Sequence, residues 1–251
     1  MAKKIVFANQ KGGVGKTTTT VNVGAYLAEA GTRVLLVDFD PQCNLTSSIG
    51  GDSARPGIYE AIIGQVSVRE AIQQTTVENL HLIPSTIDLT GATVELVDEE
   101  GREYFLRRLL ADVEAEYDYV CIDCPPSLGL LTLNGLVSAD FVIIPLQCEY
   151  FALEGLSLLL KTIHRVQLGL NSKLQIGGIV FTMYDKRTRL SHEVIREVSG
   201  YFGQKVFRTI IPRNVRLSEA PSYGQPIGLY DPSCVGASSY KKLAEEVMAS
   251  V

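Results

Sequence analysis

The sequence contains no apolar run approaching the roughly 18–20 residues that a membrane-spanning helix requires, so a transmembrane protein is not expected. A signal peptide is not expected, because residues 1–4 lead directly into an apolar segment. The sequence also lacks linkers, repeats and low-complexity stretches. Its 251 residues, 46% of them hydrophobic, can bury a sizeable core, and we expect one cytoplasmic domain over residues 1–251.

Cysteines are few and odd in number, which favours reduced thiols over a disulfide framework. Cys121 and Cys124 form a C-x-x-C pattern, but no second pair lies at the spacing typical of zinc sites. They flank Asp123 at the end of an apolar strand, where side chains alternate in direction. We therefore interpret both as small buried residues rather than metal ligands or a redox pair.

Positive charge is scarce overall but concentrated in one stretch. The formal net charge is −5, which by itself does not indicate a nucleic-acid partner. Residues 161–216, however, hold eleven Lys/Arg against three Asp/Glu, a net charge of +8, whereas the other residues sum to −13. This asymmetry is typical of a basic face on an acidic protein.

The glycine-rich stretch KGGVGKTT (residues 11–18) is the strongest motif. It follows an apolar run at 5–8 that predicts a buried strand and precedes a predicted helix at 19–30 that Gly31 ends. Strand, glycine turn and helix form the context of a phosphate-binding loop, whose backbone N–H groups and helix N-terminus surround a phosphate. A flexible surface loop is the alternative. The predicted nucleotide-binding residues are Lys11, Gly12, Gly13, Val14, Gly15, Lys16, Thr17 and Thr18.

Three carboxylates follow predicted strands near this loop. The run at 34–40 ends in Asp38 and Asp40, and the run at 119–123 ends in Asp123. Ligands of parallel sheets bind at the carboxyl ends of the strands, so these groups are expected beside the phosphates. Lys16 would reach the β- and γ-phosphates of a nucleotide. Thr17, Asp38 and Asp123 are the predicted Mg²⁺ site.

Predicted strands and helices alternate along the rest of the chain. This alternation favours an α/β fold, a doubly wound and mainly parallel sheet with helices on both faces. Further strands are predicted at 80–84, 141–146 (extended by 147–150), 176–183 and 206–212. Further helices are predicted at 57–63, 68–74, 99–116, 152–166, from about 190 to 201, and at 237–249.

The phosphate-binding loop departs from the common G-x-x-x-x-G-K-[ST] pattern, because Gln10 stands in the place of its first glycine. The variant KGGxGK[ST] resembles the deviant Walker A motif of the ParA/MinD group of P-loop ATPases. Four further stretches, VDFDPQ, DCPPSLGLLTLN, QCEYFALEGL and IPRNVRLSEAPSYGQPI, are closely similar to the chromosomal ParA proteins called Soj. The resemblance covers almost the whole chain.

The resemblance implies roles for individual residues. Lys11 would be the signature lysine that reaches the partner's nucleotide in an ATP-dependent homodimer, and Asp40 the hydrolytic carboxylate. Pro212 and Asn214 would hold the adenine, and Arg187 and Arg216 would contact the DNA backbone. The family usually has Gly-Asn after the DPQ of its switch, whereas this chain has Cys43-Asn44, which restricts the backbone there.

The function implied by the resemblance is a weak ATPase that uses ATP and Mg²⁺ and binds double-stranded DNA non-specifically on the nucleoid. A ParB-type centromere-binding protein would stimulate its hydrolysis and so partition chromosome origins. A nucleotide-gated scaffold that positions a protein cargo without DNA is the alternative. The tail adds no basic amphipathic extension, which disfavours a membrane-bound division regulator. An operator-binding domain and an iron–sulfur site are likewise disfavoured, by the short N-terminus and by the matches around Cys124 and Cys148.

Overall fold

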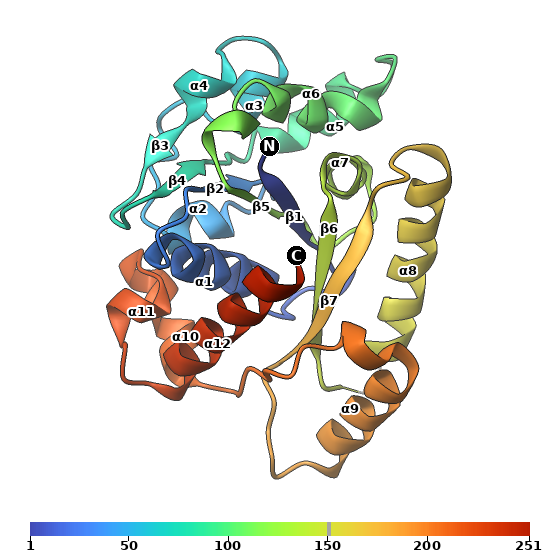
Figure 1. Ribbon diagram of the computed structural model, residues 1–251. Helices are drawn as coiled ribbons and strands as arrows, with labels where there is room; N and C mark the ends of the chain where they lie inside the picture. The colour runs from blue at the N-terminus through green and yellow to red at the C-terminus, as the bar shows by residue number, and fades with distance from the viewer. Residues whose placement is uncertain (150–151) are drawn as a thin grey trace.

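A seven-stranded sheet forms the centre of the protein (Figure 1). The structure is a computed structural model and describes residues 1–149 and 152–251. The strand order is β3-β4-β2-β5-β1-β6-β7, and every neighbouring pair is parallel except β3 and β4. The strands are β1 (Lys3–Phe7), β2 (Val34–Asp38), β3 (Gln73–Gln74), β4 (Leu80–Ile83), β5 (Tyr119–Asp123), β6 (Phe141–Gln147) and β7 (Gln175–Thr182).

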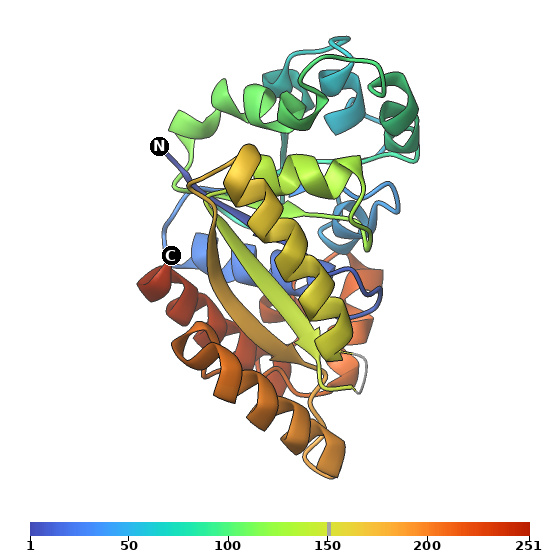
Figure 2. The same cartoon turned by 90° about the vertical axis from the view of Figure 1, so that its right-hand side faces the viewer.

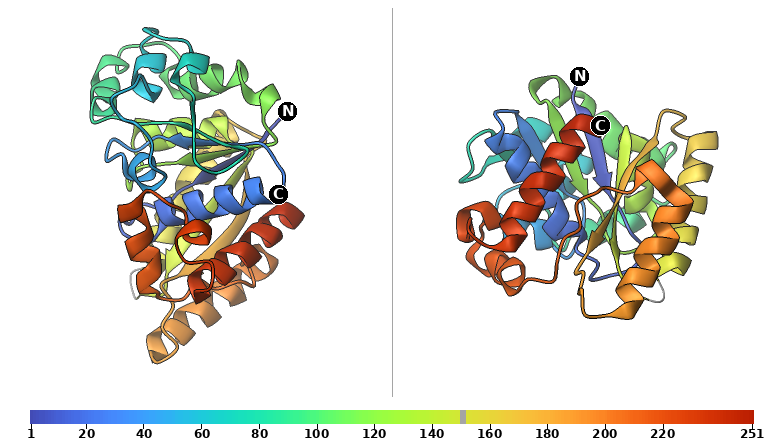
Figure 3. Two further views of the ribbon diagram at one scale, coloured as in Figure 1. Left: turned by 90° about the vertical axis from the view of Figure 1, so that its left-hand side faces the viewer. Right: turned by 60° about the horizontal axis from the view of Figure 1, so that its bottom comes forward.

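Helices cover both faces of the sheet. One face carries α1 (Lys16–Glu29), α2 (Asn44–Ser48), α10 (Val215–Glu219), α11 (Ile227–Tyr230) and α12 (Val235–Ser250). The other carries α3 (Ile58–Ile62), α4 (Val68–Ala71), α5 (Leu89–Glu95), α6 (Phe105–Ala111), α7 (Leu130–Ser138), α8 (Ala152–Gly169) and α9 (Arg189–Phe202). In Figure 2, α8 crosses in front of β6 and β7. Figure 3 shows α1 beside α12, with the two termini close together. The predicted doubly wound α/β fold is confirmed.

The buried strands separate two hydrophobic cores. All five residues of β2 are buried, and its four apolar residues alternate between the cores: Leu36 packs with α1 and α12, and Val37 packs on the opposite face. Burial on both faces explains why the central strands read as nearly continuous apolar runs. None of the helices in the described ranges is both long enough and apolar enough to cross a bilayer.

The strand predicted at 206–212 is wrong. The segment runs along the outer edge of β7 but makes only isolated bridges, at Val206 and at Pro212. The backbone N–H groups of Arg208 and Thr209 instead donate to the carboxylate of Glu246 on α12, both at 2.8 Å. The Glu246 side chain thus accepts two backbone hydrogen bonds of this segment, in place of a regular strand ladder. The local sequence of residues 206–212 does not reveal this distant partner.

Two helices are shorter than the sequence predicts. The helix predicted at 68–74 ends at Ala71, because Gln73–Gln74 pair with β4 as an antiparallel edge strand. The helix predicted at 99–116 is reduced to α6 between two short 3₁₀ turns. Its first turn is capped by Asn134 of α7, whose amide oxygen accepts from the Leu106 N–H at 3.2 Å. The predicted extension of β6 reaches Tyr150, which lies outside the described residues.

Candidate nucleotide and magnesium site

The glycine loop between β1 and α1 has the backbone that its sequence predicts. Gly13 and Gly15 lie at φ +73° and +82°, a region that favours glycine because a Cβ would be strained there. Gly15 directly precedes α1, and its carbonyl accepts the Thr19 N–H at 2.9 Å. The loop is tied to the sheet by Thr182 of β7, whose hydroxyl donates to the Val14 carbonyl at 2.8 Å. The helix N-terminus therefore faces the cavity described below.

Lys16 is the buried cation of this loop. Its side chain lies at the start of α1, and its Nζ donates to the Lys11 carbonyl at 3.2 Å. Burial lowers the pKa of Lys16, although the nearby Asp123 and Asp40 carboxylates oppose that shift. A positive charge held in place and largely removed from water is suited to a polyphosphate.

Asp38 and Asp123 are register neighbours on β2 and β5 and are fully buried. The Thr17 hydroxyl donates to Asp123 at 2.6 Å, whereas Asp38 accepts from the backbone N–H and the hydroxyl of Thr46 at 2.8 and 2.6 Å. Burial is the main cause that raises the pKa of Asp38 to about 6 and of Asp123 to about 8; repulsion from Asp38 adds to the shift of Asp123, and repulsion from Asp40 adds less to that of Asp38. A divalent cation would relieve that repulsion.

These donors fit Mg²⁺ bound with a nucleotide. In the described part of the chain no three His, Cys, Asp or Glu side chains form a metal cluster. Thr17 and Asp123 supply hydroxyl and carboxylate oxygens in contact with each other. Mg²⁺ commonly takes a few protein oxygens and completes its shell with water and phosphate. Asp38 lies behind these groups, with its oxygens held by Thr46 and the Asp40 N–H.

A cavity of about 400 Å³ opens above the loop. Asp40 lines it, whereas Asp38 and Asp123 lie behind its wall. The lining residues are Gly12, Gly13, Gly15, Lys16, Thr17, Thr18, Asp40, Gln42, Asn44, Ser48, Pro126, Met183 and Pro221. Gln42 and Asn44 are not among the predicted site residues, although they closely follow the predicted site residue Asp40 in the sequence. Met183 is the last residue of the strand predicted at 176–183, and that position at a strand end could have identified it.

A second cavity of about 280 Å³ adjoins the first. Pro212 and Asn214 line it, and the two cavities share Gly15, Thr18, Met183 and Pro221. The Asn214 side chain also caps α10 by accepting the Arg216 N–H at 2.8 Å. The sequence motifs at 11–18 and 212–214 therefore line two adjoining cavities with shared walls.

The loop after β2 is constrained at Cys43. Its φ is +55°, in the left-handed region where a side chain is disfavoured. The Asp40 carboxylate accepts the Gln42 N–H at 3.0 Å, and the Asp40 carbonyl accepts the Cys43 N–H at 2.9 Å. Asp40 is thus held by a tight turn that ends at α2. The expectation that Cys43 restricts this backbone is consistent with that conformation.

Lys11 does not line either cavity. Its ammonium forms an ion pair with Glu149 of the same chain, and Glu149 also accepts the Gln147 side-chain amide at 2.6 Å. Both partners of the pair are about half exposed, with side-chain exposures of 37% and 46%. The predicted signature lysine is therefore held at the rim of the site by its own chain.

The two arginines predicted to contact DNA lie at the surface, and both are paired with carboxylates. Arg187 binds Asp185 at 2.6 Å, and Arg216 binds Glu219 at 2.9 Å. The two cysteines of the C-x-x-C pattern lie in opposite cores and are fully buried, and burial raises the pKa of the Cys121 thiol to about 12. Their interpretation as small core residues is confirmed.

Comparisons with known proteins agree with the fold and the cavity. The model of a family described as an AAA domain matches residues 2–176. The chromosome-partitioning ATPase Soj of Treponema pallidum is 60% identical over 99% of this chain and 98% of its own. The chromosome partitioning protein ParA of Myxococcus xanthus is 54% identical over 97% and 87%. A crystal structure of cobyrinic acid a,c-diamide synthase from Mycobacterium smegmatis with bound ADP and magnesium is 41% identical, with a TM-score of 0.85 over 98% and 93%.

The parallel sheet, the glycine turn and the buried lysine define a nucleotide-binding protein of the P-loop class. The Soj and ParA relatives, which are more than 50% identical over almost the whole chain, identify the family within that class. The chain belongs to the ParA/Soj family of chromosome-partitioning ATPases, as its motifs predict.

Proposed function

We propose that this single-domain chain hydrolyses ATP with Mg²⁺ and uses the nucleotide to control its dimerisation and its binding to DNA. The observation that carries the proposal is the position of Lys16, Thr17 and Asp40 around one cavity that continues to Pro212 and Asn214. The Mycobacterium smegmatis relative carries bound ADP and magnesium, which supports the same ligands here.

The residues would act mainly by positioning and electrostatics. The loop amides and Lys16 hold the phosphates, and Thr17 and Asp123, supported by Asp38, hold Mg²⁺. When bound, Mg²⁺ neutralises charge on the phosphate oxygens. Asp40 lies on the cavity wall, fixed by its turn, and orients the attacking water. Phosphoryl transfer requires little covalent chemistry from the protein, so such positioning accounts for most of the catalysis.

Dimerisation would complete the site. Lys11 leaves Glu149, reaches the nucleotide of the partner subunit and neutralises the charge that develops during transfer. Hydrolysis then depends on the dimer, which suits a timing device. By the resemblance to Soj, the ATP dimer binds random-sequence DNA of the nucleoid, and a ParB-type protein stimulates hydrolysis and releases it. The names of the relatives support chromosome partitioning as the outcome.

A scaffold that positions a protein cargo without DNA is the second candidate. It would use the same nucleotide site, and the neutralised state of Arg187 and Arg216 favours it. The net charge of +8 over residues 161–216 favours DNA instead, because association with phosphates releases counterions.

Two measurements test the proposal. Asp40→Ala is expected to bind ATP and dimerise but not to release phosphate; hydrolysis at the normal rate would refute the role of Asp40. Retention on random-sequence duplex DNA is expected with ATP or a slowly hydrolysed analogue and not with ADP. A verified ATP dimer that fails to bind DNA would leave the ATPase assignment intact and shift the function to protein-cargo positioning.

A further inference from the structure

The loop that carries Asp40 is closed at both ends on one carboxylate. It runs from Asp38, the last residue of β2, to Thr46 in α2. One oxygen of Asp38 accepts the backbone N–H and the hydroxyl of Thr46, at 2.8 and 2.6 Å, and the other oxygen accepts the Asp40 N–H at 3.2 Å. The fully buried Asp38 side chain therefore joins the beginning of the loop to its end.

The Thr46 hydroxyl also joins this loop to the next strand of the sheet. Its oxygen accepts the backbone N–H of Ser85 at 3.0 Å, just after β4, the parallel neighbour of β2. An N–H group can only donate, so the single hydroxyl proton of Thr46 is directed to Asp38. Thr46 and Ser85 are only 1% and 0% exposed, so bulk water does not compete for these hydrogen bonds.

The remaining contacts of the loop give it a shape but not a place. The backbone N–H groups of Gln42 and Cys43 both donate to Asp40, at 3.0 and 2.9 Å, and these bonds lie within the loop. Leu45 is fully buried, but apolar packing is not directional. The Thr46 hydroxyl therefore supplies directional contacts that hold the end of the loop on the sheet.

Thr46 itself does not reach the ligand. Asp40, Gln42 and Asn44 line the cavity above the glycine loop, whereas the Thr46 hydroxyl faces Asp38 behind the cavity wall. Any effect of Thr46 on the reaction must therefore pass through the loop. The groups proposed to hold the phosphates belong to another segment, because Lys16 lies at the start of α1.

We propose that Thr46 is a positioning residue for ATP hydrolysis. Its hydroxyl holds the loop against Asp38 and Ser85 and thereby sets the place of Asp40 beside the phosphates. The assignment rests on the proposed role of Asp40 as the group that orients the attacking water. A displaced orienting group slows the chemical step, while the phosphates stay bound to the glycine loop. Loss of the hydroxyl therefore lowers kcat and leaves the KM for ATP unchanged.

The test is steady-state ATP hydrolysis by the full chain with Mg²⁺ and without DNA. Thr46→Val keeps the shape of the side chain and removes its hydroxyl, whereas Thr46→Ser keeps the hydroxyl and removes the methyl group. Thr46→Ala is the second hydroxyl-free variant, for use if the valine variant does not fold. Sedimentation with a slowly hydrolysed ATP analogue measures whether each variant still dimerises.

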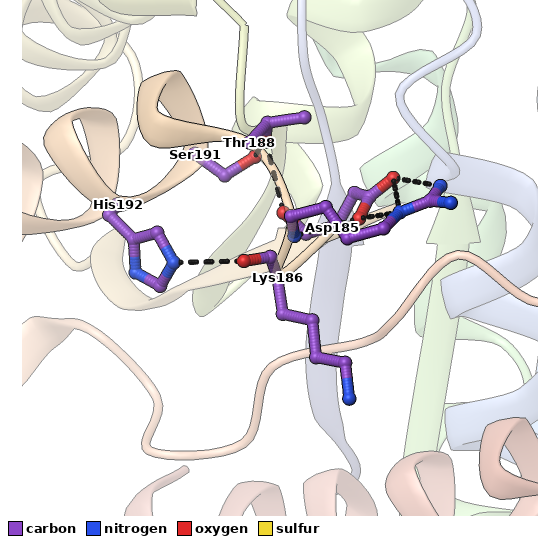
Figure 4. Close-up of polar contacts among 6 residues, drawn as sticks. Asp185, Lys186, Thr188, Ser191 and His192 are labelled. Atoms are coloured by element: carbon purple, nitrogen blue, oxygen red, sulfur yellow. Dashed lines mark hydrogen bonds and ion pairs between the residues drawn. The ribbon is translucent and has the colours of Figure 1, made fainter.

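Thr188→Val is the matched control, because it removes a threonine hydroxyl from another loop at the same end of the sheet. The Thr188 hydroxyl donates to the Asp185 carbonyl at 3.1 Å and lies 2.6 Å from the Ser191 hydroxyl (Figure 4). This loop follows β7, and none of its described residues 185–191 lines either cavity. Hydrolysis without DNA should therefore be unchanged in Thr188→Val.

Thr46→Val should lower kcat on the order of 10- to 100-fold, with an unchanged KM and an unchanged ATP dimer. Thr46→Ser should keep most of the rate. The Gln42 and Cys43 amides should exchange hydrogen faster in the valine variant than in the serine variant, a local change that needs no nucleotide.

Four results would overturn the assignment of Thr46: a normal kcat in the hydroxyl-free variants, an equally low kcat in Thr46→Ser, a raised KM or lost dimer in place of a lower kcat, and an equal loss in Thr188→Val. Asp40→Ala is measured in parallel. Normal hydrolysis by Asp40→Ala would overturn the proposed role of Asp40, whereas an inactive Asp40→Ala beside a fully active Thr46→Val would overturn the role of Thr46 alone.

Discussion

Replacing Glu149 with glutamine should tighten ATP-dependent dimerisation. In the single chain, Glu149 holds Lys11, the residue that we propose must reach the partner's nucleotide. Half-exposed ion pairs are worth about 0.2–1 kcal/mol, and two of them would break in each dimer. Removing both therefore removes a cost of about 0.4–2 kcal/mol, which corresponds to a dimerisation constant about 2- to 30-fold tighter.

Sedimentation velocity across a protein concentration series, with a slowly hydrolysed ATP analogue, measures this change. Glu29→Gln is the matched control, because it breaks an exposed glutamate–lysine pair with Lys241, a pair of α1 and α12 that includes no site residue. The gain from Glu149→Gln should shrink at high salt, since salt screens exposed charges. Equal or weaker dimerisation than the unaltered protein would refute the idea that Glu149 restrains Lys11.

Three further predictions concern nucleotide binding, pH and packing. Lys16→Ala should abolish nucleotide-dependent dimers in the same sedimentation assay, because it removes the buried cation of the phosphate cavity. The pKa values of Asp38 and Asp123 are raised to about 6 and about 8, so the folded, ligand-free chain binds more protons than the unfolded chain between about pH 4 and 8. Its thermal midpoint should therefore fall as the pH rises from 6 to 8, and Asp123→Asn should flatten that dependence. Gly178→Ala would place a methyl group 2.3 Å from the Phe207 ring and should cost about 1–3 kcal/mol in denaturant unfolding, whereas Gly169→Ala, with nothing within 4 Å, should be nearly neutral.

Elements with local signals can be predicted from the sequence. The strand at Tyr119–Asp123 has the bounds that the sequence predicts, because the apolar run and the carboxylate that ends it are both visible in the local sequence. The glycine loop is predictable for the same reason, since Gly13 and Gly15 allow a backbone that other residues resist. That Lys16 and Asn214 belong to one nucleotide site is predicted only from the family resemblance, because the spacing of the two residues in the sequence does not indicate it.

Features that depend on distant contacts escape prediction. The segment at 206–212 does not form a regular strand ladder, and two of its backbone N–H groups donate instead to Glu246 of α12. The ion pair between Lys11 and Glu149 joins positions 138 residues apart. Arg216 pairs with Glu219 and with Asp231, which lies outside the basic stretch 161–216. Counting the charged residues of that stretch therefore does not reveal these ion pairs.

The most direct test of the account is sedimentation of Asp40→Ala with a labelled random-sequence duplex, in ATP and Mg²⁺ or in ADP and Mg²⁺. We expect DNA to move with a protein dimer in ATP, and both protein and DNA to sediment separately in ADP. DNA bound equally by an ADP-loaded monomer would contradict nucleotide control. A dimer in ATP that leaves the DNA free would contradict DNA binding as the function of that control.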